Sequence, residues 1–411
     1  MPPAAMAALM LSVFTVSIGY GVVVPLLPFL VERLLGASRD TASVASSTGL
    51  LAGLYALSLF VFAPIWGRLS DRFGRREILV IGLVGFSLTM LAVGFIENLV
   101  AIYIERLLSG MFAAAVTPVA MATIGDLAAT EDARGRHLTF VSLAGIAGFL
   151  LGPTLGVYLA SNPGNLLPIA GAAGSLSLPL AWTALLSFIV AVGVWMTVRA
   201  SATAGVALLV HYAATKIAPG LVLRLLILAF IASAGVGTFE VGLALRGKQQ
   251  LELTQYQIAL MFLECSLVMF IVQALVFSPW IKSKTTRWFI GPAFLILAIG
   301  LALVPAATTF PSLLLVIGAV AASAGILSPI LTYWISNKAG RAQGQELGMQ
   351  TAASSLGAAV GSAAGGVLFD VVWLPNAAFV LVAALALIGV VLNFGLANLL
   401  SPRMSRDRAQ R

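Results

Sequence analysis

The sequence predicts an all-α integral membrane protein in which twelve transmembrane helices form two pseudo-symmetric six-helix bundles. Of its 411 residues, 60% are hydrophobic and only 9% are charged, whereas soluble domains are about 45–50% apolar and about 25% charged. The apolar residues fall into twelve long runs, and the basic residues gather between alternate runs. Composition, run length and charge placement therefore all indicate a multi-pass membrane protein.

Each apolar run has about the length that a helix needs to cross ~30 Å of hydrocarbon. The runs are uniformly apolar and do not alternate with polar residues, which favours helices over the strands of a barrel. The predicted spans are 9–33, 44–66, 77–95, 99–125, 137–160, 178–198, 221–245, 256–280, 288–308, 311–335, 345–371 and 375–399.

The positive charges predict how the chain is oriented. With an even number of spans, eighteen of the 23 lysines and arginines lie on the side of the membrane that holds both termini. Arg33, Arg39, Arg246 and Lys248 lie on the other side, and Arg106 lies within the fourth span. Because loops rich in Lys and Arg stay cytoplasmic, we expect both termini in the cytoplasm and the protein in a bacterial inner (plasma) membrane.

The chain divides near its middle. We expect an N-terminal bundle over 1–198, a cytoplasmic central loop over 199–220, a C-terminal bundle over 221–400 and a basic cytoplasmic tail over 401–411. A shift of 209 residues places four glycines of one half on four of the other, namely Gly135, Gly148, Gly152 and Gly156 on Gly344, Gly357, Gly361 and Gly365. Such a repeat predicts a substrate site between the halves near mid-membrane.

A dense cluster of charge separates the second and third spans, and we expect it to form a tight, solvated turn. The cluster resembles the G-x-L-x-D-R-x-G-R-[KR] signature of the major facilitator superfamily, which it matches at Gly67, Leu69, Asp71, Arg72, Gly74, Arg75 and Arg76. The resemblance implies a cytoplasmic gate in which Asp126, at the end of the fourth span, pairs with an arginine of this loop, with Arg72 as the expected partner. The alternatives are an ordinary positive-inside loop and a plain acid at a helix end.

Two further spans contain residues that bend helices or bring them close together. In the first span, Pro25 and Pro28 remove backbone donors, and with Gly19 they resemble the G-x(5)-P-x-x-P pattern of proton-coupled drug antiporters. The fifth span resembles the G-x-x-x-G-P-x-x-G element of exporters in the same family, through Gly148, Gly152, Pro153 and Gly156. The resemblance implies antiport, and the alternatives are a simple kink and ordinary packing.

The fourth span carries Arg106 at a depth where a charge costs roughly 2.5–3.5 kcal/mol on insertion scales. Arg106 should therefore face the bundle interior and find a partner. Arg106-x-x-x-Gly110 resembles the family's fourth-helix motif, which implies a part in proton transfer. Glu105 lies about 100° around the helix, so it is not the expected intrahelical partner of Arg106, although both are candidates for proton coupling.

Two acids lie in the C-terminal half, Glu240 in the seventh span and Glu264 in the eighth. A carboxylate within a span can take up and release a proton near neutral pH, and it can pair with a cationic substrate. The alternative for Glu240 is a side chain that reaches the external surface and pairs with Arg246 or Lys248. Residues on the same helical faces are weaker candidates for a cavity, namely Tyr20, Tyr55, Ser109, Ser233, Gln257, Gln273 and Gln350.

These motifs together resemble the twelve-helix drug/proton antiporter branch, which contains tetracycline and multidrug exporters. The resemblance implies proton-coupled efflux of a small amphipathic compound by alternating access. One departure is that the first span has no acid ahead of its prolines, which shifts the expected coupling to Glu240, Glu264 and the Glu105–Arg106 pair. The alternatives are a facilitator or symporter for a metabolite, lipid or iron chelate, and a non-transporting scaffold or sensor.

Other classes of function are not expected. The chain has no G-x(4)-GK[ST] loop for a nucleotide, and we expect no enzyme activity, cofactor, metal site or nucleic-acid partner. The expected partners are protons, a small-molecule substrate and the lipid bilayer, and the chain should act as a monomer. Its single cysteine, Cys265, is expected to be a small buried apolar residue.

Overall fold

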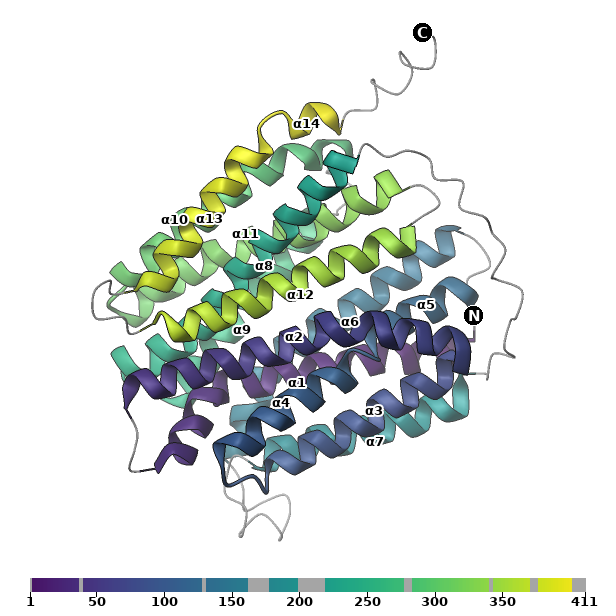
Figure 1. Ribbon diagram of the computed structural model, residues 1–411, viewed down its shortest axis with the longest axis horizontal. Coiled ribbons are helices and arrows are strands. Elements are labelled where there is room, and N and C mark those ends of the chain that lie inside the picture. The colour runs from purple at the N-terminus through teal and green to yellow at the C-terminus, as the bar shows by residue number, and fades with distance from the viewer. Residues whose placement is uncertain are drawn as a thin grey trace. The chain divides into compact units, whose positions relative to one another are not determined.

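The computed structural model describes residues 2–36, 40–127, 131–161, 177–198, 219–276, 283–339, 343–369 and 376–400. Figure 1 shows that these residues form long helices. The predicted tail over 401–411 and most of the predicted central loop lie outside them, and the last two residues of that loop begin a helix. The helices are α1 (Pro3–Leu35), α2 (Thr41–Phe73), α3 (Arg75–Val93), α4 (Leu99–Ala113), α5 (Thr117–Leu127), α6 (Glu131–Ser161), α7 (Ser177–Thr197), α8 (Pro219–Leu245), α9 (Gln255–Val276), α10 (Ile290–Leu303), α11 (Phe310–Ala339), α12 (Gln343–Val367), α13 (Ala377–Asn393) and α14 (Leu396–Leu399).

The predicted spans coincide with these helices. Within the described ranges, 10 helical stretches are long and apolar enough to cross a membrane. Helix α12 and the shorter α13 lie where the last two spans are predicted. The fourth span consists of α4 and α5, which are joined by a turn at 114–116. The all-α, twelve-helix membrane fold predicted from the apolar runs is thereby confirmed.

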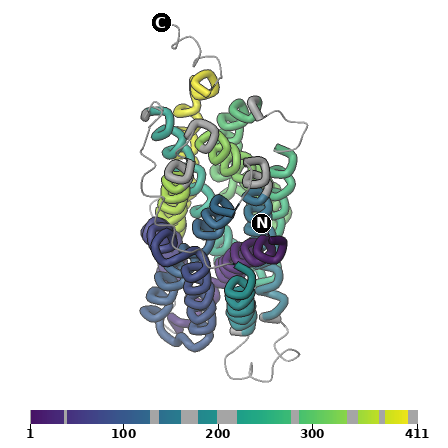
Figure 2. The backbone as a smooth tube through the Cα atoms, turned by 90° about the vertical axis from the view of Figure 1, so that its right-hand side faces the viewer, coloured from purple at the N-terminus to yellow at the C-terminus, as the bar shows by residue number. Residues whose placement is uncertain are grey.

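The chain forms two compact units, Met1–His211 with Leu243–Leu263 and Tyr212–Gly242 with Glu264–Arg411. In the first unit α1 packs most extensively on α6, α3 packs on α7, and α2 packs on α4. In the second unit α10 packs on α13 and on α11. Figure 2 views several of these helices nearly end-on.

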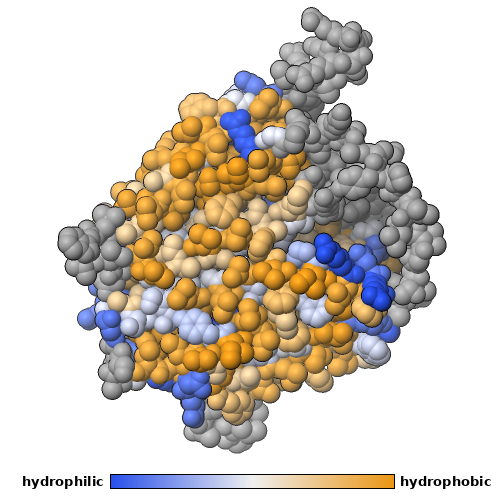
Figure 3. All heavy atoms as spheres, in the orientation of Figure 1, coloured by the Kyte–Doolittle hydropathy of each residue, from blue (hydrophilic) through white to orange (hydrophobic). Residues whose placement is uncertain are grey.

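The outer faces of the helices are apolar. On α7 the exposed side chains recur at helical spacing and are all hydrophobic, as at Leu185, Phe188, Ile189 and Val192. The opposite face carries the buried Ser187, whose hydroxyl donates to the Leu83 carbonyl of α3 at 2.7 Å. Figure 3 shows hydrophobic side chains over most of the described surface on one face. In water this would be an unusually large exposed patch, whereas in a bilayer it is the surface that lipid covers.

Candidate functional site

Helix α2 does not end where its apolar run ends, at Trp66, but continues to Phe73. Its 33 residues are about 50 Å long at 1.5 Å per residue, which exceeds the ~30 Å of hydrocarbon. The last two turns therefore extend beyond the apolar layer, where their arginines can be solvated without leaving the helix. The predicted tight turn over 67–76 is thus wrong except at Gly74, which alone separates α2 from α3.

Gly74 makes the sharp turn between these two helices. Its φ is 104°, a left-handed value that favours glycine. A Cβ at this position would also overlap the Glu77 carboxylate, which folds back over the glycine. The neighbouring Arg76 donates to Glu77 Oε1 and lies over the Trp195 ring of α7, 4.1 Å from its centroid. A side chain at position 74 would therefore strain the backbone of the turn and displace the Glu77 carboxylate.

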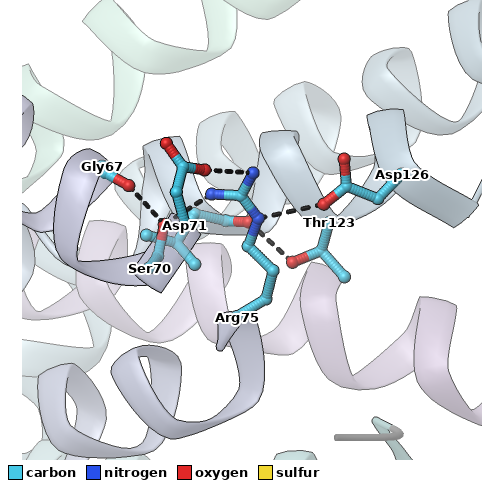
Figure 4. Close-up of polar contacts among 7 residues, drawn as sticks. Gly67, Ser70, Asp71, Arg75, Thr123 and Asp126 are labelled. Carbon is cyan, nitrogen blue, oxygen red and sulfur yellow. Dashed lines mark hydrogen bonds and ion pairs between the residues drawn. The ribbon is translucent and has the colours of Figure 1, made fainter. Parts of the chain in front are cut away.

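Arg75, the first residue of α3, holds the junction together, as Figure 4 shows. Its Nη2 forms an ion pair with Asp71 Oδ1 at 2.6 Å, and its Nε pairs with Asp126 Oδ2 at 3.0 Å. Its Nη1 donates to Ser70 Oγ at 2.5 Å. Because Asp71 and Ser70 lie on α2 and Asp126 lies on α5, one guanidinium links three helices.

The expected pairing of Asp126 with Arg72 is wrong. Because α2 stays helical through Phe73, Arg72 points outward, and its guanidinium lies over the Phe73 ring, 5.4 Å from the centroid. Sequence reasoning also missed Ser70, which is buried and donates to the Gly67 carbonyl at 2.7 Å. A small polar residue one turn before Gly74 was the available signal for this role.

We expect Arg75→Gln to loosen the junction and Arg72→Gln, which removes the same charge nearby, to leave it unchanged. The acid partners are 64% and 52% exposed, so the contacts of Arg75 together contribute about 1–2 kcal/mol. Their loss should speed amide hydrogen exchange at the α2–α3 junction about tenfold. Mass spectrometry of the 66–80 peptide measures this, and equal exchange in the two variants would contradict the assignment to Arg75.

A buried ion pair lies on α4. Arg106 is 2% exposed and Glu105 is 4% exposed. Arg106 Nε donates to Glu105 Oε2 at 2.6 Å, and Arg106 Nη2 donates to Glu105 Oε1 at 2.8 Å. The expectation that these neighbours would not pair is wrong. The long arginine side chain bends back along the helix, and two of its three guanidinium nitrogens donate to the two carboxylate oxygens. Ser109 is buried beside them and donates to the Arg106 carbonyl at 3.2 Å.

A row of stacked aromatic rings from three other helices begins beside this ion pair. The Arg106 guanidinium lies 6.0 Å from the centroid of the Tyr55 ring on α2. Tyr55 stacks on Tyr20 of α1 at 5.2 Å, and Tyr20 stacks on Phe149 of α6 at 5.8 Å. The structure thus brings together two predicted cavity residues and Arg106, and it adds Phe149. Tyr55 is buried whereas Tyr20 and Phe149 are half-buried, so this aromatic column is accessible at its end away from Arg106.

The glycine–proline motif of α6 packs against α1 where α1 has a proline of its own. A Cβ on Gly152 would lie 2.8 Å from Gly21 Cα. Pro25 leaves the Gly21 carbonyl without its helical donor, and Pro153 does the same to the Phe149 carbonyl. The Phe149 oxygen lies 3.0 Å from the Cβ position of Gly21. The two backbones therefore meet where both helices have lost a hydrogen bond.

The second unit repeats this contact between α12 and α8. Along α6, Gly148, Gly152 and Gly156 approach Phe14, Gly21 and Val22 of α1, respectively. Along α12, Gly357, Gly361 and Gly365 approach Phe230, Ala234 and Thr238 of α8 in the same way. The register predicted from glycine spacing is therefore present in the packing. For Gly135 and Gly344 the structure describes only helical backbone.

The second unit has hydroxyl groups at its helix crossing, one of them in place of a proline of the first unit. Ser362 occupies the repeat position of Pro153, and its Oγ donates to the Gly237 carbonyl at 3.4 Å. Thr238 Oγ1 donates to the Gly361 carbonyl at 2.8 Å. In α6, by contrast, the Thr154 hydroxyl is buried without a hydrogen-bond partner. Helices α8 and α12 are thus joined by side-chain hydrogen bonds at their crossing.

The two acids of the C-terminal half lie in one region of the second unit. Glu240 on α8 is 8% exposed. Glu264 on α9 is half-buried, and its Oε2 is shielded and has no hydrogen-bond partner. Its Oε1 lies 3.7 Å from the Cβ position of Gly318 on α11. The Cys265 thiol is buried, as expected, and lies within electrostatic reach of both carboxylates.

The remaining predicted residues have different surroundings. Gln350 is buried and donates to Thr332 Oγ1 at 2.5 Å. Gln257 accepts from the backbone N–H of Thr254 at 3.0 Å, so it caps the start of α9. Ser233 and Gln273 are half-buried on α8 and α9. Among the residues whose placement is described, no group of three His, Cys, Asp or Glu side chains could hold a metal ion.

These features define a class of protein. Secondary transporters are built in this way, with a repeated helix crossing, charged groups buried between helices and an apolar surface that faces lipid. The chain belongs to the Major Facilitator Superfamily, whose family model matches residues 9–345 and 225–411. Members of this family are transporters and not enzymes, so the chain is a multi-pass membrane transporter.

Known relatives and structures are similar over nearly the whole chain. The quinolone resistance protein NorA of Staphylococcus aureus (strain COL) is 27% identical over 364 residues, and multidrug resistance protein 2 of Bacillus subtilis (strain 168) is 27% identical over 362 residues; each match covers 88% of both chains. A D-xylose-proton symporter superposes with a TM-score of 0.73 at 16% identity, covering 95% of this chain and 96% of that one. The human organic anion transporter MFSD10 (TETRAN) gives 0.68 at 18% identity, covering 96% and 100%. These structural matches show the shared fold.

Proposed function

We propose that the protein exports small amphipathic compounds in exchange for protons, by alternating access between its two predicted bundles, 1–198 and 221–400. In this proposal it lies in the bacterial plasma membrane with both termini in the cytoplasm and acts as a monomer without a cofactor. The names of two relatives, a quinolone resistance protein and a multidrug resistance protein, support export. The close crossing of α1 and α6 at Gly152–Pro153 supports the exporter type.

The observation that carries proton coupling is the burial of Glu240, which is the only acidic residue of α8. The charged form of a carboxylate is costly to hold inside a membrane span, so an acid retained there points to a proton site. Glu264 lies nearby with one shielded oxygen that has no hydrogen-bond partner. We assign proton exchange to Glu240 and place Glu264 beside it as a second acid that a cationic substrate can approach.

Contact with the substrate is supported in the first unit by the aromatic column. Tyr20 and Phe149 are half-buried, and Phe149 forms the end of the column away from Arg106, where aromatic rings can attract planar and cationic groups. Arg106 already has a bidentate partner in Glu105, so its charge is balanced inside the unit. The column therefore suits a flat amphipathic compound better than a small anion.

The exchange follows from competition between a proton and the substrate. When the site opens to the cytoplasm, the acid releases its proton and the carboxylate attracts the compound. When the site opens outward, a proton from the outside binds the carboxylate, removes its charge and releases the compound. The neutral acid then costs less to bury, which favours the return of the empty protein.

The test is proton release from purified protein in detergent while cationic and neutral amphipathic compounds are added. Wild type should release protons as the compound binds, Glu240→Gln should release none, and Glu264→Gln should bind cationic compounds at least tenfold more weakly. Glu97→Gln, which changes an exposed acid in the loop between α3 and α4, is the matched control.

Three outcomes would change the proposal. If the compound binds without proton release in wild type and in all variants, the antiport mechanism is contradicted and a facilitator is favoured. Proton uptake together with the compound would indicate a symporter. Absence of any binding or transport across a broad panel would favour a scaffold or sensor role.

A further inference from the structure

A second charged cluster lies at the ends of helices opposite the arginine-rich junction. It joins the π-helical turn Arg246–Gln250, which follows α8, to the last turns of α1. Both segments belong to one compact unit, because Leu243–Leu263 packs with Met1–His211. This end is extracellular in the proposed topology.

Lys248 is the centre of this cluster. Its side chain is 12% exposed, and its Nζ forms an ion pair with Glu32. The same Nζ donates to the Pro28 carbonyl at 2.9 Å and lies 4.5 Å from the centroid of the Phe29 ring. An acid, a carbonyl and a ring from the last turns of α1 therefore surround one ammonium group that sequence reasoning placed in a loop on the outside.

The local backbone explains why Lys248 reaches α1. The chain leaves α8 through a π-helical turn in which the Leu251 N–H donates to the Arg246 carbonyl at 3.1 Å. Such wider turns rotate the residues that follow and are frequent at functional sites. Arg246 Nη1 braces the turn by donating to Gln250 Oε1 at 2.6 Å. The next residue after Lys248, Gln249, donates to the Thr41 carbonyl at the start of α2 at 3.2 Å.

We propose that Lys248 is an extracellular latch, which fastens the π-helical turn after α8 to the outer end of α1 and must release before the transporter opens outward. This inference rests on the proposed alternating access. Arg75 links three helices at the arginine-rich end, and Lys248 gives the opposite end a cation with a comparable set of acceptors. Because Lys248 is mostly shielded and combines an ion pair with a carbonyl and a ring contact, its loss shifts the equilibrium more than loss of an exposed pair does.

The experiment measures opening directly and needs no substrate. In a Cys265→Ser background, spin labels at Glu97→Cys and Thr308→Cys report the distance between two exposed loops at the outer end, by double electron–electron resonance. We expect Lys248→Gln and Glu32→Gln each to raise the population of the longer distance about tenfold. The reversed pair, Lys248→Glu with Glu32→Lys, should restore the wild-type distribution. Arg33→Gln removes an exposed charge one residue from Glu32 and should change nothing.

Unchanged distributions in both single variants would overturn the latch, as would an equal shift in Arg33→Gln. If Lys248→Gln does not fold, Glu32→Gln gives the same test with the lysine in place. Proton release by substrate is measured separately. A latch without proton exchange would therefore contradict the proposed function alone, and proton exchange without a shift would contradict the latch alone.

Discussion

Arg106→Ala should be the most damaging single substitution in the first unit. It leaves Glu105, 4% exposed, without the guanidinium that contacts both of its oxygens. Breaking a buried pair from one side costs about 3–5 kcal/mol, because the remaining charge stays buried. We expect the free energy of unfolding, measured in detergent with increasing dodecyl sulfate, to fall by about this amount. Export of a fluorescent cation from vesicles should be lost as well.

A double variant separates the structural part of this effect from the functional part. Glu105→Leu with Arg106→Met leaves no buried charge, so it should recover most of the lost stability. It should still fail to export. Arg106→Lys keeps the charge but cannot contact both oxygens, and should lie between the two in stability. Export at the wild-type rate by the double variant would reduce the ion pair to a structural role.

Gly361→Val should be the most damaging substitution in the second unit. A Cβ at Gly361 would overlap the Ala234 carbonyl oxygen, which is backbone and cannot rotate away. Helices α12 and α8 would have to separate by about 1 Å and weaken the hydrogen bond from Thr238 to the Gly361 carbonyl. We expect a loss of about 3 kcal/mol, at the upper end of overpacking costs.

The matched control is Gly193→Val on α7, where nothing lies within 4 Å of the Cβ position. It makes the same change in a transmembrane helix without a contact. Thermal unfolding of the two purified variants should show a clear decrease in melting temperature for Gly361→Val and little change for Gly193→Val. Similar melting temperatures would show that the crossing of α8 and α12 tolerates an extra side chain.

The helices and the internal repeat could be predicted because they depend on features that are local or periodic. An apolar run of membrane length specifies a span wherever it occurs. The glycine register of α6 and α12 could be predicted because close backbone contact requires small residues at fixed spacing. Their partners on α1 and α8 were not predicted, since nothing in one helix specifies which other helix it contacts.

The errors in the candidate site have physical causes. Hydropathy marks where α2 leaves the apolar layer, but the helix itself ends at Gly74, so Arg72 and Arg75 could not be told apart as partners of Asp126. Helical geometry indicates that the Cβ atoms of Glu105 and Arg106 diverge, but a long side chain reaches further than its Cβ direction suggests. The aromatic column joins rings from three helices, and its order depends entirely on tertiary packing.

The contrast between the two glycine crossings gives the two units different internal mechanics. In the first, α6 packs closely on α1, both helices carry prolines at the contact, and Thr154 forms no hydrogen bond there. In the second, the hydroxyl groups of Thr238 and Ser362 form hydrogen bonds between α8 and α12. We therefore expect α6 to shift along α1 more readily than α12 shifts along α8. The more rigid crossing thus lies in the unit that carries Glu240 and Glu264, and the more adjustable one lies in the unit that carries the aromatic column.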